Sequence, residues 1–249
     1  GKFNLLGYQP QTITLVSIST MTNPETAGLS VGIIMDGNRR WARERGLHTF
    51  EGHKAGLEKI PELMEWAKEM GVKEVVLYAF STENWGRAVD EVDYLMKLFE
   101  KFFEKWMETA VEKGTKIRFI GDLSRASEKI RVLIKRVEET TFEGTEGTLI
   151  VAFSYGGRPE ILAAVNTLLS QGKTMVDEQM FTDALWSHDL MDPDIIVRTG
   201  GEKRLSNFLT WRSAYSELFF TDTKWPAFSK EEFLSIIEEY GNRERRRGK

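Results

Sequence analysis

Hydrophobic and polar positions in this 249-residue chain follow two alternating patterns. Short apolar runs, typical of strands covered on both faces, alternate with longer stretches in which apolar residues recur every three or four positions, as in amphipathic helices. The short runs predict strands at 31–35, 75–80, 117–120, 149–153, 195–197 and 218–220. The longer stretches predict helices at about 52–70, 89–113, 124–141, 158–171, 177–187, 205–214 and 229–245.

This alternation predicts an α/β fold with a single domain, in which a mostly parallel six-stranded central sheet carries helices on both faces. Residues 1–30 are polar and rich in Thr and Ser, and we interpret them as an N-terminal arm or linker before a domain at 31–249. Ligands of such folds bind beyond the carboxyl ends of the strands, so functional side chains are expected in the segments that follow each strand.

The composition narrows the classes of protein that fit. Hydrophobic residues make up 41% of the chain and charged residues 29%, which is typical of a globular protein, and a net charge of −4 provides no broad attraction for nucleic acid. The absence of cysteine excludes disulfides and a thiolate nucleophile and favours a cytoplasmic location. No apolar run approaches the roughly 20 residues that span a membrane, and no signal peptide is evident.

The segment 31–41 predicts a strand, a turn and the start of a helix. Asp36 follows the apolar run and so lies at the carboxyl end of the strand, where Gly37 allows the backbone to turn. Arg39, Arg40 and the free N–H groups of the following helix can face an anion. A carboxylate suited to a metal therefore stands beside groups suited to a phosphate.

Two further segments add polar groups near strand ends. In 52–56, Gly-His-Lys-Ala-Gly, the two glycines share one helix face and allow a backbone or ligand to approach, while His53 is either a site residue or a capping or surface histidine. The segment 81–87 gathers hydroxyl, carboxylate, amide, indole and guanidinium groups. A plain turn has little need for Trp85 and Arg87 together, so we interpret this segment as ligand-binding.

A third strand end is strongly basic. The apolar run at 195–197 is followed by Arg198, two glycines, Lys203, Arg204 and Ser206, with Ser206 expected near a helix start. Guanidinium groups and turn N–H groups can together hold an anion, and a solvated basic turn is the alternative.

Other segments carry weaker signals. Glu217 brings one more carboxylate to the start of the last strand, and 153–160 fits a structural turn as well as a ligand contact. Gly172-Lys173-Thr174 resembles the end of a P-loop, but the required earlier glycine is missing. The chain has neither a Gly-x-Gly pair nor a Gly-x-Ser-x-Gly elbow, so phosphate must be held by arginines and helix ends.

Several long motifs, in order, make the chain from about residue 31 onward resemble the cis-prenyltransferases of the undecaprenyl diphosphate synthase type. They are Ile-Ile-Met-Asp-Gly-Asn-Arg-Arg-Trp-Ala, Gly-His-Lys-Ala-Gly, Tyr-Ala-Phe-Ser-Thr-Glu-Asn-Trp, Tyr-Gly-Gly-Arg, Ile-Val-Arg-Thr-Gly-Gly-Glu-Lys-Arg-Leu-Ser-Asn-Phe, Tyr-Ser-Glu-Leu-Phe-Phe-Thr-Asp and Trp-Pro. The Asp-Asp-x-x-Asp clusters of the unrelated trans-prenyltransferases do not occur.

The resemblance implies a transferase that condenses isopentenyl diphosphate onto an allylic prenyl diphosphate, forms cis double bonds, and releases pyrophosphate. It implies Mg²⁺ as cofactor, with Asp36 handling the ion on the allylic diphosphate and Glu217 as a second metal ligand. Asn84 would assist proton removal. Loss of the diphosphate creates negative charge that magnesium and arginines stabilise, which fits these roles.

The resemblance also implies the substrate contacts. Gly37, Asn38, Arg39, Arg40 and His53 would cradle the allylic diphosphate, and Trp41 would contact substrate. The segment 81–87 would supply further contacts through Ser81, Thr82, Glu83, Trp85 and Arg87. The isopentenyl diphosphate would bind Arg198, Arg204, Leu205 and Ser206. Two positions depart from the family pattern: Thr49 stands where many relatives have a phosphate-binding arginine, and Lys203 where bacterial relatives often have a histidine.

The apolar stripe of the helix at 89–113 is broad and rich in aromatic residues. Core packing is the usual role of such a stripe. The resemblance implies a second role, as one wall of an apolar tunnel that shields the growing prenyl chain, with Phe99, Phe102, Phe103 or Trp106 able to close it.

The arginine-rich end of the chain has two interpretations. By charge alone it is a solvated tail. By resemblance, Arg246-Arg247-Gly248 matches an ending that reaches the partner's site in a homodimer. Peripheral membrane association through the product is also implied.

The main alternative function is a non-catalytic subunit of a heteromeric enzyme, against which the retained Asp36 and Asn84 argue. A third alternative is a phosphatase-like enzyme, and chiefly the resemblance distinguishes the chain from that class.

Overall fold

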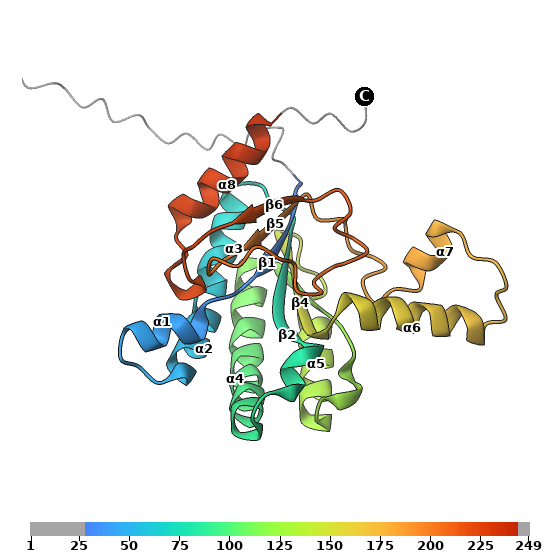
Figure 1. Ribbon diagram of the computed structural model, residues 1–249, viewed down its shortest axis with the longest axis horizontal. Coiled ribbons are helices and arrows are strands. Elements are labelled where there is room, and N and C mark those ends of the chain that lie inside the picture. Colours follow the sequence, from blue (N-terminus) through green and yellow to red (C-terminus); the bar gives the residue numbers. More distant parts are fainter. Residues whose placement is uncertain (1–27, 244–249) are drawn as a thin grey trace, which may run out of the picture.

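The computed structural model describes residues 28–243, and its centre is one parallel sheet (Figure 1). The strand order is β3-β4-β2-β1-β5-β6, and every neighbouring pair is parallel. The predicted α/β fold is therefore confirmed, with each strand boundary within two residues of expectation. The strands are β1 (Ser30–Ile34), β2 (Glu74–Ser81), β3 (Thr115–Ile120), β4 (Gly147–Tyr155), β5 (Ile195–Arg198) and β6 (Glu217–Phe220).

Eight α-helices lie within residues 28–243. The predicted helix at 52–70 is two helices, because Pro61 has no N–H to continue the hydrogen-bond ladder of the first and suits the start of the second. The helices are α1 (Asn38–Glu44), α2 (Thr49–Glu58), α3 (Ile60–Glu69), α4 (Val89–Lys113), α5 (Glu128–Thr141), α6 (Gly157–Ser170), α7 (Glu178–Asp183) and α8 (Lys230–Asn242), with short 3-10 helices η1 (Thr82–Gly86), η2 (Leu123–Arg125) and η3 (Trp225–Ala227).

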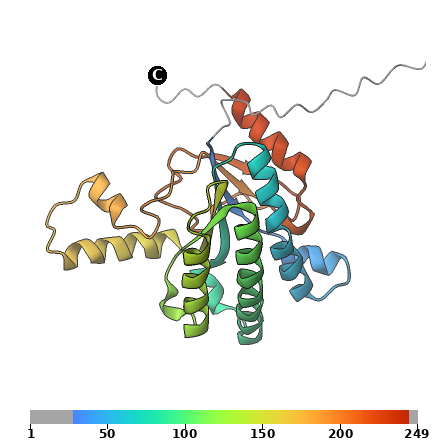
Figure 2. The same ribbon diagram turned by 180° about the vertical axis from the view of Figure 1, so that it is seen from behind.

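The two faces of the sheet are covered differently. Helices α3, α4, α5 and α8 pack on one face and form the larger hydrophobic core (Figure 2). Alternate strand residues such as Ile34 and Val76 point to the other face, where Leu190, Phe208 and Leu209 cover them. This alternation is the period-two pattern of a strand buried on both sides.

The predicted helix at 205–214 is wrong, because this segment consists of turns. Leu205, Phe208 and Leu209 have the spacing of a helix face, which explains the prediction. However, Ser206, Asn207 and Leu209 have positive φ angles of 49°, 68° and 43°, which a right-handed helix does not allow. Ser206 is therefore held in a turn rather than at a helix start.

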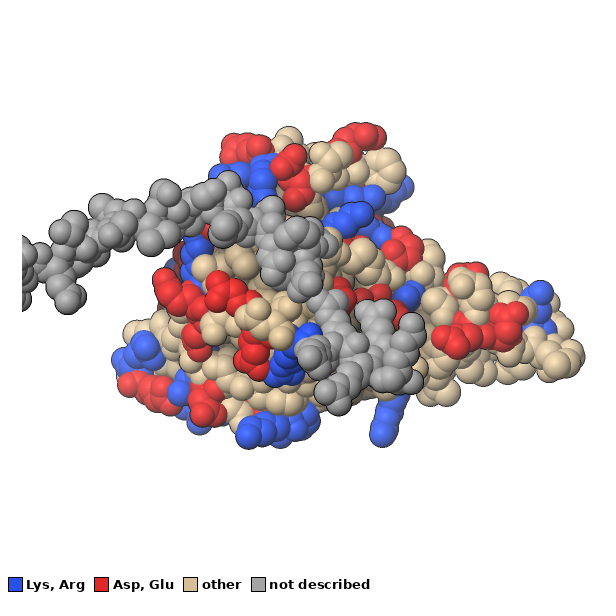
Figure 3. All heavy atoms as spheres, turned by 90° about the horizontal axis from the view of Figure 1, so that it is seen from above, with Lys and Arg blue, Asp and Glu red and all other residues tan. Residues whose placement is uncertain are grey.

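Helices α6 and α7 extend away from the rest of the fold (Figures 1 and 2). No helix within 28–243 is both long enough and apolar enough to cross a membrane. On the face shown in Figure 3, lysines and arginines are mixed with aspartates and glutamates rather than forming one basic surface. The predicted arm up to residue 27 and the Arg246-Arg247-Gly248 ending lie outside the described residues.

Candidate active site

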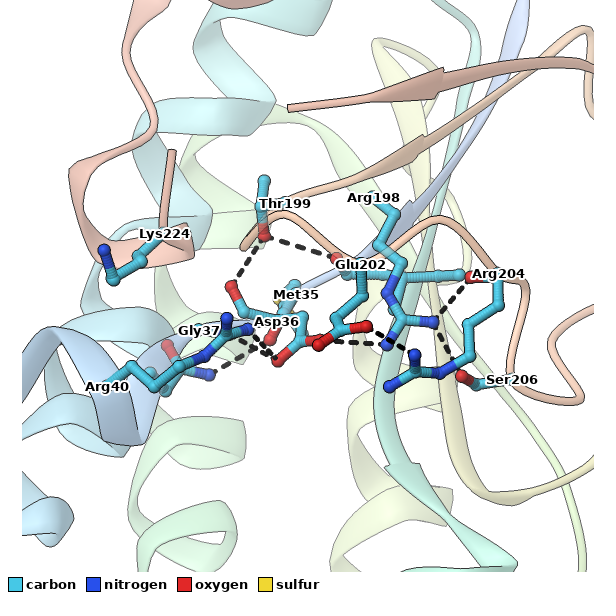
Figure 4. A network of polar contacts seen from close by, with 12 residues as sticks. Met35, Asp36, Gly37, Arg40, Arg198, Thr199, Glu202, Arg204, Ser206 and Lys224 are labelled. Atoms are coloured by element: carbon cyan, nitrogen blue, oxygen red, sulfur yellow. Dashed lines mark hydrogen bonds and ion pairs between the residues drawn. The ribbon is translucent and has the colours of Figure 1, made fainter. Parts of the chain in front are cut away.

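Asp36 lies just beyond β1, at the centre of the carboxyl edge of the sheet. Its Oδ2 atom is 2.9 Å from Arg198 Nη2, and its Oδ1 atom accepts a 2.6 Å hydrogen bond from the Gly37 N–H (Figure 4). Arg40 Nη2 lies 3.4 Å from Oδ1. Arg198 is buried, whereas 31% of the Asp36 side chain is exposed. The carboxylate is thus anchored on one side and open to a ligand on the other.

The turn expected at Gly37 is present and leaves no room for a side chain. Gly37 has a φ of 101°, and a Cβ atom there would lie 2.8 Å from Lys224 Cβ. The N–H of Trp225 donates to the Asp36 carbonyl at 2.9 Å. The β1–α1 turn is therefore pinned against η3, which fixes the position of Asp36.

A cavity of about 500 Å³ opens beside Asp36 and gathers residues from the ends of β1, β2 and β5. An adjoining space of about 380 Å³ lies over α1 and is strongly basic. The structure therefore brings together most of the residues singled out in the sequence. These are Asp36, Asn38, His53, Ser81, Glu83, Asn84, Arg87, Arg198 and Ser206 in the larger cavity, and Gly37, Arg39 and Arg40 in the adjoining space, which also includes Arg43.

Two predicted aromatic contacts line neither space. Trp41 packs under the Arg45 guanidinium, whose central carbon is 4.4 Å from the ring centre. The Trp85 indole donates to Ser154 Oγ at 3.0 Å. Both rings have structural partners within the chain, so their substrate contacts stay predictions.

Other residues that the sequence singled out also lie outside both spaces. Arg204 is exposed, with its Nη1 atom 2.5 Å from a carboxylate oxygen of Glu202. The Thr82 hydroxyl bonds the neighbouring carboxylate of η1, and Leu205 packs against the smaller core. Thr49 is the first residue of α2. The substrate contacts of Arg204, Thr82 and Leu205 stay predictions.

The 3-10 helix η1 presents Glu83 and Asn84 to the cavity. Asn84 Oδ1 accepts a 3.1 Å hydrogen bond from the Ser81 N–H, which closes the turn. The Trp85 ring packs edge-on against Phe80 at 4.9 Å. The aromatic residue in this segment therefore anchors the loop, and the polar residues beside it face the site.

His53 is a buried member of the site. Its side chain is 10% exposed, and Nε2 lies 3.4 Å from Glu91 Oε1. Burial, followed by the nearby Arg87 charge, lowers the pKa of His53 to about 4, although Glu91 acts in the opposite direction. His53 is thus neutral at physiological pH and can act there as a hydrogen-bonding group rather than as a cation.

The low pKa of His53 predicts a loss of stability in mild acid. The unfolded chain takes up a proton at this position below about pH 6.5, whereas the folded protein resists protonation until about pH 4. The contribution of His53 to stability is therefore complete above pH 6.5 and falls as the pH drops towards 4. Between pH 7 and pH 5, the wild type should lose about 2 kcal/mol more unfolding free energy than a His53→Gln variant. Urea unfolding of both proteins at the two pH values measures the difference.

The exposed His188 provides the control for this pH dependence. A His188→Gln variant should follow the wild type at both pH values. Equal losses in the wild type and in His53→Gln would show that protonation of His53 does not oppose folding.

Glu91 is a site residue that the sequence interpretation missed. From the first turn of α4, its Oε1 atom lies 3.0 Å from Arg87 Nη1 and its Oε2 atom 3.8 Å from Arg39 Nη1. It also faces His53. The signal in the sequence is the four-residue spacing of Arg87 and Glu91, a spacing at which opposite charges commonly pair.

Glu217 begins β6 and so lies at the amino edge of the parallel sheet, opposite Asp36. Its Oε2 atom is 2.7 Å from Arg243 Nη1. A single chain does not bring the two carboxylates together, and the predicted role of Glu217 in binding magnesium stays a prediction. Within residues 28–243, no three His, Asp or Glu side chains form a group that could hold a metal.

Comparisons with known proteins agree with this geometry. A family model described as "Putative undecaprenyl diphosphate synthase" matches residues 34–248. An isoprenyl transferase of Thermotoga maritima is 46% identical over 222 residues, which cover 88% of this chain and 95% of that protein.

Two solved structures are similar throughout. A probable undecaprenyl diphosphate synthase from Campylobacter jejuni has a TM-score of 0.75 and 36% identity, covering 88% of this chain and 98% of that one. Lavandulyl diphosphate synthase from Lavandula x intermedia, in complex with dimethylallyl diphosphate, has a TM-score of 0.85 and 31% identity, covering 90% of this chain and 100% of that one.

Proposed function

Because this chain belongs to the undecaprenyl diphosphate synthase family of isoprenyl transferases, we propose that Asp36 is the centre of its reaction. The enzyme is a cis-prenyltransferase, which condenses isopentenyl diphosphate onto an allylic diphosphate. The observation that supports the proposal is the partly exposed Asp36 carboxylate between two basic groups of residues, one on α1 and one after β5.

The space over α1 suits the allylic diphosphate. Arg39, Arg40, Arg43 and Arg87 line it, so it favours an anion. The donor set also fits Mg²⁺, since this ion is usually held by one or two carboxylates together with substrate phosphates and water. Asp36 would hold it here, and the ion would supply charge stabilisation as the diphosphate departs. The arginines bind and orient the same leaving group.

The segment after β5 suits the isopentenyl diphosphate. Arg198 reaches Asp36 with one nitrogen and donates to Ser206 Oγ at 2.6 Å with another. Arg204 extends its guanidinium from the same turn. The isopentenyl diphosphate would replace Glu202 as the ion-pair partner of Arg204. Asn84, at the cavity wall, would assist removal of the proton lost after the new carbon–carbon bond forms, by hydrogen bonding to the groups that carry it away.

The prenyl chain would extend along α4. A cavity of about 50 Å³ is lined in part by Phe99, and another of about 60 Å³ lies between α3 and α4 beside Trp106. Phe103 lines neither and packs against both aromatic rings, at 5.6 and 5.8 Å. The stripe is thus core in this structure, and a growing chain would displace these rings to form the proposed tunnel.

Purified protein incubated with labelled isopentenyl diphosphate, a set of allylic primers and Mg²⁺ tests the function. We expect label in an apolar solvent extract, and none after magnesium is removed with a chelator. A protein that transfers no label with any primer would instead be the non-catalytic subunit. Transfer that is indifferent to the chelator would overturn the magnesium role alone.

We also propose a homodimer that pairs through α6. This helix projects from the fold (Figure 1). Leu162, Val165 and Leu169 share one side of it by their spacing and are exposed, the two leucines at 62% and 63%. Contiguous exposed apolar surface of this kind marks an interface. We expect a Leu162→Asp, Leu169→Asp double variant to sediment as a monomer at concentrations where the wild type is a dimer.

Val132→Asp on α5 is the matched control, because Val132 is also exposed, at 58%. Its sedimentation should equal that of the wild type. A wild type that is monomeric, or a double variant that still pairs, would exclude this interface.

A further inference from the structure

Asn207 joins the segments that follow three different strands. It belongs to the turn after β5 and lines the site cavity. Its Nδ2 atom donates to Glu83 Oε1 at 2.9 Å, in η1 after β2. Its Oδ1 atom accepts from the Arg158 N–H at 2.8 Å, and its carbonyl accepts from the Gly157 N–H at 2.7 Å, both at the start of α6 after β4. One residue therefore holds three loops together around Asp36.

The backbone of Asn207 is left-handed, with a φ of 68°. Asparagine tolerates this conformation better than most residues, and such a backbone persists only where its surroundings determine it. The hydrogen bonds to Glu83, Arg158 and Gly157 hold the backbone of Asn207 in this conformation. The direction of the amide side chain is consequently fixed.

These bonds continue a chain of contacts that begins at Asp36. Arg198 lies 2.9 Å from Asp36 Oδ2 and 2.6 Å from Ser206 Oγ. Asn207 follows Ser206 and reaches Glu83. The segment proposed to hold isopentenyl diphosphate is thus connected to η1, which carries the residue proposed for proton removal.

The chemistry of the Asn207–Glu83 contact is specific. Partial burial raises the pKa of Glu83, but hydrogen bonds from its own backbone N–H and from Asn207 outweigh burial and lower it. Glu83 is therefore a carboxylate, and its exposed side chain takes one hydrogen-bond donor from the turn after β5. The Asn207 amide supplies that donor and at the same time offers an acceptor to Arg158.

We propose that Asn207 is a positioning residue that sets the spacing between the two substrates by tying the turn after β5 to η1. This inference rests on the proposed function of those two segments. Asn207 has no assigned contact with the reacting atoms. Its loss should therefore misplace the bond-forming groups and lower kcat more than it weakens binding of either diphosphate.

The test is a double-mutant cycle on the full chain. Asn207→Asp should lower kcat about tenfold or more and change each KM less than about threefold, because two carboxylates then face each other at 2.9 Å. In a Glu83→Gln background the same change should cost less than about threefold, because the glutamine amide can donate to the new carboxylate. A contact that only stabilised the fold would instead lower the thermal stability and leave kcat of the folded protein unchanged.

Asn207→Gly gives a second measurement, since glycine keeps the left-handed backbone but makes neither side-chain bond. It should lose kcat as Asn207→Asp does. Asn242→Asp, at the exposed end of α8, is the control for the same chemical change. Equal losses in both backgrounds, or an Asn207→Asp variant with wild-type kcat, would overturn the Asn207 proposal alone. A wild type without turnover would overturn the proposed function and this inference with it.

Discussion

Replacing Asp36 with alanine should lower kcat about a thousandfold or more, which corresponds to about 4 kcal/mol in the activation barrier. The carboxylate is the open group between the two basic segments, and residues 28–243 contain no cluster of three potential metal ligands that could replace it. Its removal would leave the departing diphosphate without the magnesium that we propose Asp36 holds. Steady-state rates with saturating primer and isopentenyl diphosphate measure the effect.

The Asp36→Asn variant tests whether the charge of the side chain is required, because it removes the charge and keeps the shape. Asparagine keeps an oxygen that can accept from the Gly37 N–H or from Arg198, so the local structure should persist while turnover stays low. Asp93→Ala, on the exposed surface of α4, is the control. Near-normal turnover in either Asp36 variant, with thermal stability unchanged, would remove Asp36 from the mechanism.

Gly52→Ala should destabilise the fold by about 3 kcal/mol or more, because it would separate α1 from α2. A Cβ atom at Gly52 would lie 2.0 Å from the Asn38 carbonyl oxygen, a backbone atom that has no flexible side chain to move aside. Asn38 lines the site, so the surviving folded protein should also lose activity. Urea unfolding measures the first effect.

Gly86→Ala is the matched control for Gly52→Ala. A Cβ atom at Gly86 would meet no atom within 4 Å, and the unfolding free energy should change by less than about 1 kcal/mol. If Gly52→Ala were as stable as this control, α1 and α2 would not be in the close backbone contact described above.

The strands could be predicted because their signal is local. A run such as 31–34 needs only its own apolar residues to indicate a strand, and Asp36 then follows at its carboxyl end. The turn at 205–216 could not be predicted in this way, because its left-handed residues Ser206 and Asn207 are stabilised by contacts from distant segments. Helical spacing of Leu205 and Phe208 there reflects packing on the sheet rather than a helix.

The position of Glu217 illustrates a different limit. Its place at the start of a strand, in a sheet expected to be parallel, already puts it at the edge opposite Asp36. The resemblance grouped Asp36 and Glu217 because both are implied to bind magnesium. Within a single chain the two residues do not lie close together. Glu91 was missed for the opposite reason: apart from Arg87, four residues before it, its partners Arg39 and His53 come from segments that only the fold brings close.

The strand order has a consequence for how the chain acquires its site during folding. β1 lies between β2, which follows it closely in sequence, and β5, whose Arg198 is 162 residues away from Asp36. Pairing of β1 with β2 closes a short loop, whereas pairing with β5 closes a long one and must wait for most of the chain. A nascent chain emerging from the ribosome can therefore pair four of the six strands, β3-β4-β2-β1, while its central carboxylate still lacks its guanidinium partner.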